Sequence, residues 1–208
     1  LNIMKNVKVS LGLALSFVLL LFSSQIYAQD SSRQGNIAYS NISFFAHGGE
    51  GVLDADFTGG TVRGSYAFSE RFFFLADYSR QRTDDTITIG PVATKVSTQQ
   101  GHLGLGFHTP VASNTDFVLT SQYAVAIVEL PQQSVTTEGV LVNFGLRSRA
   151  IDRWELAVGG NYSSQLDQGE VGYSLSGHYY LKPQVSLGVN VESVFDVKVY
   201  GVILKHDL

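Results

Sequence analysis

The sequence predicts an all-β fold: a closed, antiparallel, up-and-down transmembrane β-barrel of ten strands, preceded by a signal peptide. Composition is the first observation, because the 208 residues are 44% hydrophobic and only 15% charged, with 21 glycines and 12% aromatic residues. The second is that apolar and polar residues alternate over repeated segments of about ten residues, the length at which a tilted strand crosses a bilayer. The third is that short turns and longer polar loops separate these segments.

The first 28 residues have the pattern of a secretory signal peptide. Lys5 and Lys8 precede an apolar run over residues 9–22, and the small residue Ala28 closes the segment. A membrane-spanning helix needs about 20 apolar residues, so this run is too short to be an anchor. We expect export and cleavage after Ala28, which leaves residues 29–208 as the outer-membrane barrel domain.

The clearest hairpin covers residues 138–164. Every second residue from Val140 to Leu146 is apolar, and the alternation resumes at Trp154 after a polar break at residues 151–153. Strands in soluble domains are most often about 5 to 6 residues long, whereas both arms of this hairpin are about twice that. The length of the arms favours a membrane.

Ten segments of this kind follow one another along the mature chain. They are residues 36–46, 58–68, 72–82, 96–108, 116–128, the two arms of 138–164, 171–181, 185–192 and about 197–208. An even number of strands closes a bacterial barrel, and closure satisfies every backbone polar group in lipid. The alternative is a barrel of eight strands. It would result if the weak first segment were not a strand and another segment paired differently.

The connections fall into two classes. Turns of three residues are expected at 69–71, 151–153 and 182–184, and a further turn at 109–115. Longer loops are expected at 47–57, 83–94 and 129–137. Outer-membrane barrels have short periplasmic turns and longer outer loops, so both ends of the mature chain are expected in the periplasm.

Aromatic residues are predicted to form a girdle at the turn ends of the strands. They occupy the same alternate positions as the other apolar residues, and so lie on the apolar face of each strand. The girdle residues are Phe68, Phe72, Phe107, Phe117, Trp154 and Tyr179. Aromatic rings settle at the level of the lipid headgroups, so this placement is typical of a membrane barrel.

The hairpin at residues 66–74, which reads Tyr-Ala-Phe-Ser-Glu-Arg-Phe-Phe-Phe, together with the signal peptide and the repeated alternating strands, resembles the small bacterial outer-membrane β-barrels of the OmpA and opacity type. The resemblance implies an outer-membrane location with lipid and lipopolysaccharide as surroundings. It also implies that the assembly machinery reads the C-terminal strand. Members commonly end in Phe, whereas this chain ends in Leu208.

Charged residues on the inward parity are the candidate site. They are predicted to form a polar network in the lumen that contains Arg63, Asp77, His102, Arg147, Arg149, Glu155 and Glu192. In one interpretation the arginines pair with the acids and plug the barrel, because an unpaired buried charge is costly. In the other, the same residues form a constriction that selects small solutes by charge and size.

Four basic residues near the outer rim are candidates for contact with lipopolysaccharide phosphates. They are Arg80, Arg82, Lys95 and Lys198, which lie just below acidic loops. A charged surface that simply keeps the loops solvated is the competing interpretation.

Enzymatic, cofactor and nucleic-acid functions are not expected. The chain has no cysteine, so it has no thiolate nucleophile or metal ligand, and its formal net charge of −4 disfavours nucleic acid. Ser176 and His178 have a spacing that resembles a catalytic pair, but His178 is expected to point inward near the periplasmic end. We therefore expect no catalytic, metal or cofactor residues.

Three functions are compatible with these sequence features. The first is a non-enzymatic outer-membrane barrel with a structural or surface-interaction role in the cell envelope. The alternative is a narrow, porin-like channel for small solutes, and the third is an enzyme that modifies lipid A.

Overall fold

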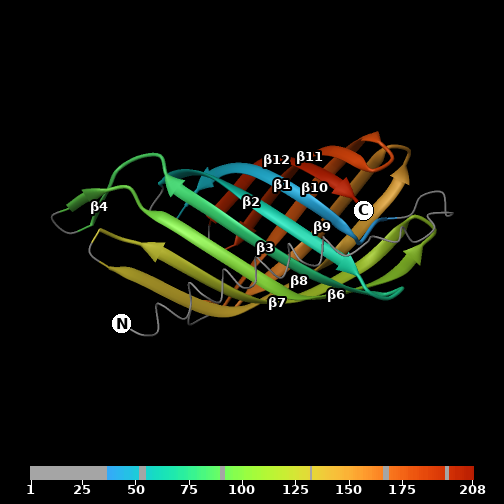
Figure 1. Cartoon of the computed structure of the whole chain (residues 1–208), viewed down its shortest axis with the longest axis horizontal. Helices are drawn as coiled ribbons and strands as arrows, with labels where there is room; N and C mark the ends of the chain where they lie inside the picture. Colours follow the sequence, from blue (N-terminus) through green and yellow to red (C-terminus); the bar gives the residue numbers. More distant parts are fainter. Residues whose placement is uncertain (1–36, 52–54, 90–91, 132, 166–168, 195–196) are drawn as a thin grey trace.

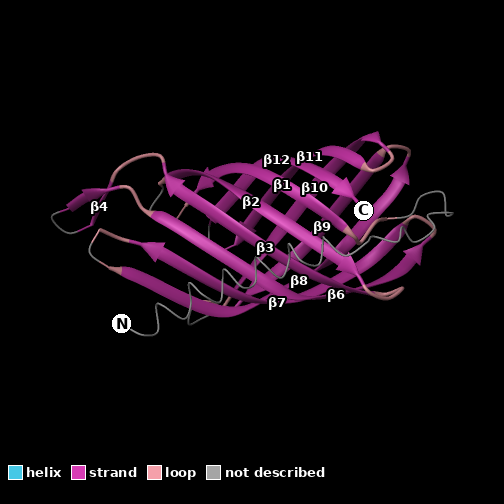
Figure 2. Cartoon of the chain, viewed as in Figure 1, coloured by secondary structure: helices cyan, strands magenta, loops and turns pink. Residues whose placement is uncertain are grey.

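The computed structural model describes residues 37–51, 55–89, 92–131, 133–165, 169–194 and 197–208 (Figure 1). The predicted signal peptide, residues 1–28, lies outside these ranges. Figure 2 shows strands, turns and loops in the described part of the chain. No helix among the described residues is long and apolar enough to cross a bilayer.

The described residues form twelve strands: β1 (Asn41–Glu50), β2 (Asp56–Ala67), β3 (Phe72–Thr83), β4 (Ile87–Ile89), β5 (Val92–Thr94), β6 (Ser97–Ala112), β7 (Thr115–Glu129), β8 (Ser134–Ile151), β9 (Trp154–Ser163), β10 (Glu170–Lys182), β11 (Val185–Val194) and β12 (Val197–Asp207). Ten of them close into one barrel in the order β1-β12-β11-β10-β9-β8-β7-β6-β3-β2, and β4 and β5 form a separate hairpin. The prediction of ten strands is confirmed, and the alternative of eight is wrong.

Pairing of β1 with β12 closes the barrel. The two strands are antiparallel from the Asn41↔Asp207 pair to the Glu50↔Lys198 pair. Each of the ten strands therefore has a hydrogen-bonded neighbour on both sides, and the sheet has no free edge along the shared length of its strands. The backbone N–H and C=O groups are therefore hydrogen-bonded within the sheet, because lipid offers them no hydrogen-bond partner.

The barrel has two distinct ends. At the turn end, short connections join β2 to β3, β6 to β7, β8 to β9 and β10 to β11, and the C-terminus lies at this end (Figure 1). At the loop end, the connection between β3 and β6 carries the β4–β5 hairpin, which projects beyond the barrel (Figure 1).

The structure corrects several predicted boundaries. The first strand begins at Asn41 and continues to Glu50, so most of the loop expected at 47–57 is strand. The loop expected at 129–137 is short, because β7 reaches Glu129 and β8 begins at Ser134. The loop expected at 83–94 contains the β4–β5 hairpin.

Two glycines explain the error at β1. The pair Gly48 and Gly49 is typical of a loop, but these residues pair with Tyr200 and Val199 of β12. A Cβ atom on Gly49 would lie 1.8 Å from the carbonyl oxygen of Lys198. Glycine is therefore needed here for a close approach of two strands, which is also a known use of this residue within sheets.

The predicted turn at 109–115 is a smaller one. β6 runs through Pro110 to Ala112 with an irregularity in register between them, which leaves Ser113 and Asn114 as the turn. Proline lacks a backbone donor and is tolerated at such bulges.

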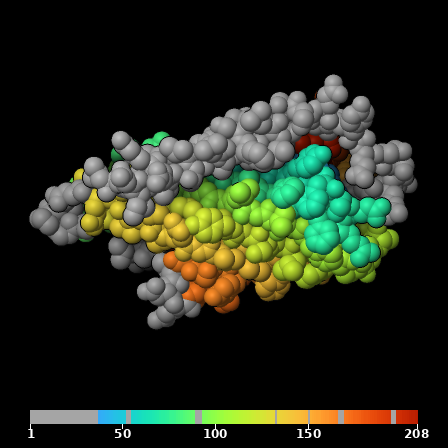
Figure 3. Space-filling view, turned by 60° about the horizontal axis from the view of Figure 1, so that its bottom comes forward, coloured from blue at the N-terminus to red at the C-terminus, as the bar shows by residue number. Residues whose placement is uncertain are grey.

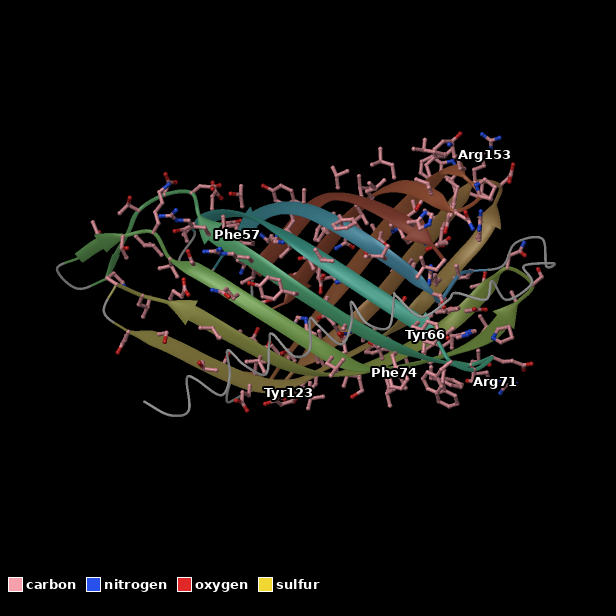
Figure 4. All side chains as sticks on the ribbon, viewed as in Figure 1. Phe57, Tyr66, Arg71, Phe74, Tyr123 and Arg153 are labelled. Atoms are coloured by element: carbon pink, nitrogen blue, oxygen red, sulfur yellow. The ribbon has the colours of Figure 1, made fainter. Side chains whose placement is uncertain are left out.

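An apolar band surrounds the outer wall. Each of the ten barrel strands exposes large hydrophobic side chains, for example Phe44, Tyr66, Phe74, Leu105, Tyr123, Phe144, Leu156, Leu175, Val189 and Val202. Tyr66, Phe74 and Tyr123 mark this face in Figure 4, and Figure 3 shows part of the wall as one continuous surface. Exposure of such an apolar surface to water is unfavourable, whereas its contact with the hydrocarbon of a bilayer is favourable. The fold is therefore a transmembrane barrel.

Candidate functional site in the barrel lumen

The inward positions of the barrel are mostly polar. On β9, for example, Glu155, Asn161 and Ser163 are buried while Leu156 and Tyr162 are exposed. Alternation along each strand thus separates a lipid face from a polar lumen.

A cluster of buried charges crosses the lumen near the turn end. We call this cluster the floor; it consists of Arg147, Glu155, Tyr180, Lys205 and Asp207. Glu155 is its centre, and its carboxylate accepts hydrogen bonds from Arg147 Nε at 2.8 Å and from Lys205 Nζ at 3.1 Å. The Tyr180 hydroxyl lies 2.8 Å from Glu155 Oε2 and 2.7 Å from Asp207 Oδ2. Lys205 Nζ is also 3.4 Å from Asp207 Oδ1.

The floor is among the most buried parts of the described chain. Tyr180 is 2% exposed, Glu155 3% and Lys205 5%. Formally, Arg147 and Lys205 contribute two positive charges, and Glu155 and Asp207 contribute two negative ones. Buried charges are stable when they are paired and hydrogen-bonded in this way.

Stacked side chains widen the floor. The Arg149 guanidinium lies 3.8 Å from the centre of the Tyr180 ring, and that of Arg147 lies 5.0 Å from the centre of the Tyr39 ring. Tyr39, which precedes β1, donates a hydrogen bond to Asp116 Oδ2 at 2.9 Å. Burial raises the pKa of the Tyr39 phenol, against the lowering effect of Arg147, so this group stays a hydrogen-bond donor.

Above the floor lies a cavity of about 420 Å³. Arg147 and Leu75 line its lower part, and Gln81, Gln165 and Val197 line it at the loop end. Its volume is within the range of small-molecule pockets, roughly 300–1,000 Å³. The lumen is therefore filled at one end and hollow at the other.

The structure places the seven predicted lumen residues in two groups. Arg147, Arg149 and Glu155 belong to the floor or stack on it. Arg63, Asp77, His102 and Glu192 line the cavity instead.

Four residues of the candidate site are not singled out by the sequence pattern: Lys205, Asp207, Tyr180 and Tyr39. Lys205 and Asp207 share the inward parity of β12 with Ile203, and this alternation is the signal that points to them. The contacts of Tyr180 depend on the pairing of β10 with β9, which alternation does not reveal.

The predicted rim residues point outward at the loop end. Arg80 and Arg82 are exposed on β3. Lys95 is exposed as well, and its Nζ donates to the backbone carbonyl of Asp84. Lys198 Nζ is 3.7 Å from Glu50 Oε2, and both side chains are about half exposed or more, at 63% and 48%.

The predicted girdle residues lie at the turn end, and in the described part of the chain five of the six, all but Phe117, have a ring contact with another of them. The ring centres of Phe68 and Phe72 are 6.4 Å apart, those of Phe72 and Phe107 5.3 Å, and those of Trp154 and Tyr179 5.2 Å. Arg71 and Arg153 lie beyond these rings, also at the turn end (Figure 4).

The fold and the site define a closed, ten-stranded transmembrane barrel with a buried ionic cluster, the floor, in its lumen near the turn end. No protein-family model and no curated protein sequence matches the chain. Among solved structures it is similar to Neisserial surface protein A, with 13% identity, a TM-score of 0.44, and coverage of 81% of this chain and 95% of that one.

Two further solved structures are similar to the chain. The translocator domain of the autotransporter NalP from Neisseria meningitidis has 8% identity and a TM-score of 0.46, over 81% of this chain and 88% of that one. The outer membrane phospholipase A from Escherichia coli has 12% identity and a TM-score of 0.40, over 86% and 95%. At these values the matches do not define a function, so the class of the chain rests on its own closed sheet and apolar band.

Proposed function

We propose that the chain is an integral outer-membrane β-barrel protein with a non-enzymatic, structural or surface-interaction role, and that its lumen is closed at the turn end. The observation that carries this proposal is the floor, in which Glu155 holds Arg147, Lys205 and Tyr180 across the lumen. A buried cluster held by the Arg147–Glu155 and Lys205–Glu155 ion pairs would leave no path for solutes through the turn end. The functional surface is then the loop end.

The turn end is assigned to the periplasm. Short connections gather at this end, and the hairpin-bearing connection projects from the other, which is the asymmetry of outer-membrane barrels. In this orientation Arg80 and Arg82 lie at the outer leaflet, where their guanidinium groups would bind lipopolysaccharide phosphates. The terminal strand β12, with Leu208 after it, would be read by the assembly machinery from the periplasm.

A lipid A-modifying role has little support in the geometry. His178 is buried in the lumen, and its nearest hydrogen-bonding side chain is Ser186, at 3.5 Å from Nδ1. A catalytic group for lipid A would need to face the outer leaflet.

Cell fractionation tests the location and class of the protein. We expect the exported protein in the outer-membrane fraction. We also expect unboiled and boiled samples to migrate differently in a semi-native gel, because a closed barrel resists detergent until heated. Purified protein that stays soluble without detergent, or that shows no shift on boiling, would contradict the proposal.

The narrow channel is the second candidate, and the cavity above the floor favours it. A channel would require the floor to open, and electrical recording in a planar bilayer would detect the resulting conductance.

A further inference from the structure

A three-residue cluster occupies one wall of the cavity. Arg63, Asp77 and His102 are register partners on the adjacent strands β2, β3 and β6. His102 Nδ1 lies 2.7 Å from Asp77 Oδ1, whereas Arg63 Nε is 3.9 Å from Asp77 Oδ2. The Arg63 side chain is 50% exposed although it points into the barrel. Asp77 is thus held closely by His102, and most donors of Arg63 remain available to a ligand.

A single carboxylate faces this cluster. Glu192 lines the same cavity from β11, which is five strands from β6 in either direction around the ten-stranded ring. Among the described residues, Glu192 has no ion-pair partner within 4.0 Å. Arg63, His102 and Glu192 all line this one cavity.

Two glycines line the cavity on the wall opposite Arg63. Gly145 and Gly159 are register partners on β8 and β9, and β9 is five strands from β2 around the ring. A Cβ atom on Gly159 would lie 2.5 Å from the carbonyl oxygen of Phe144. Glycine therefore allows β8 and β9 to approach closely here, and neither glycine places a side chain in the cavity.

A buried acceptor without a hydrogen-bond partner belongs to a residue in the wall of the same cavity. Gln122 lines the cavity, is only 5% exposed, and its Oε1 atom has no hydrogen-bond partner in the described part of the chain. A buried acceptor without a partner destabilises the fold, and a donor from a ligand or a water would recover that loss.

We propose that the cavity above the floor binds a small zwitterionic solute, of the size of an amino acid or a dipeptide. Its carboxylate would be bound by the guanidinium of Arg63, and its ammonium group by the carboxylate of Glu192, with Gln122 Oε1 as a further acceptor. The proposal deepens the surface-interaction role, and it rests on that proposed function in taking the loop end as the entrance.

The charges of the two walls select against other solutes. An anion with no positive group would face Glu192 and Asp77, and a cation with no negative group would face Arg63. An uncharged solute would leave both Arg63 and Glu192 without a charged partner. A solute with both charges is the class that satisfies the two walls together.

Calorimetric titration of the refolded full chain in detergent micelles tests this assignment. The probe is glycylglycine, and the matched control is N-acetylglycinamide, which has nearly the same shape and no charge. We expect saturable binding of one glycylglycine per barrel. N-acetylglycinamide should bind at least about tenfold more weakly, since each charge-assisted hydrogen bond contributes about that factor or more.

Two variants separate the walls. Glu192→Gln and Arg63→Gln should each weaken binding of glycylglycine by about tenfold or more. Glu138→Gln is the matched control, because Glu138 accepts a hydrogen bond from Tyr123 on the exposed side of the barrel. It should leave binding unchanged, and the gel shift on boiling shows that each variant is folded.

Three results would overturn the assignment: no saturable heat with the wild-type chain, equally tight binding of N-acetylglycinamide, or unchanged affinity in folded Glu192→Gln. The experiments distinguish failure of the proposed solute binding from failure of the proposed closure of the lumen. A barrel that is silent in bilayer recordings and does not bind glycylglycine overturns this assignment alone, whereas steady conductance with glycylglycine binding supports this assignment and overturns the closed floor.

Discussion

Replacement of Glu155 by Gln is expected to lower the free energy of unfolding by about 3–5 kcal/mol, the cost of removing one partner from a buried ion pair. Glu155 is the carboxylate that binds both Arg147 and Lys205. Its side chain is only 4% exposed, so solvent does not screen the loss. In the variant, Asp207 would be the only carboxylate left in the floor to balance the two buried positive charges of Arg147 and Lys205.

Urea titration in detergent micelles or lipid vesicles measures this effect, and Trp154, the single tryptophan of the chain, reports on unfolding. Glu192→Gln is the matched control, because Glu192 also faces the lumen but has no ion-pair partner among the described residues. We expect its unfolding free energy to stay within about 1 kcal/mol of wild type. Equal stability of Glu155→Gln and the wild-type chain would show that the floor is not held by this ion pair.

Replacement of Leu175 by Arg is expected to cost about 2–4 kcal/mol, because it places a charge on the lipid face near the bilayer midplane. Leu175 lies in the middle of β10 and is 55% exposed on the outer wall. The control is Val171→Arg, on the same face of the same strand but close to the loop end, where the cost falls to about 0–1 kcal/mol.

The same urea titration compares the two variants. A barrel in water would treat both substitutions alike, since an arginine on a solvated surface costs little at any height. An equal and small effect of Leu175→Arg and Val171→Arg would therefore contradict the assignment of the outer wall to lipid.

The barrel is predictable from the sequence because period-two alternation survives wherever one face meets lipid and the other meets the lumen. Where a segment leaves the membrane band, the signal disappears. The start of β8, with Val135 and the polar Thr136 and Thr137, resembles a loop although its backbone pairs with β7. Gly48 and Gly49 resemble a turn because glycine serves both flexible turns and closely packed strands, and sequence does not distinguish the two.

The candidate site is predictable only in part. Alternation identifies which residues point inward, and Arg147 and Glu155 are among them. Their partners depend on the stagger of strands around the barrel, which fixes the height at which each side chain meets the lumen. Lys205 of β12 meets Glu155 of β9 across 50 residues of chain, and no local pattern carries that information.

Planar-bilayer recording of the refolded wild-type chain tests the central claim most directly, namely that the floor closes the lumen. We predict a silent baseline with no steady open state, because Glu155, Arg147, Lys205 and Tyr180 fill the turn end. A steady open-state conductance in the wild-type chain, changed in size by Arg147→Gln, would contradict the closed floor and identify the protein as a channel.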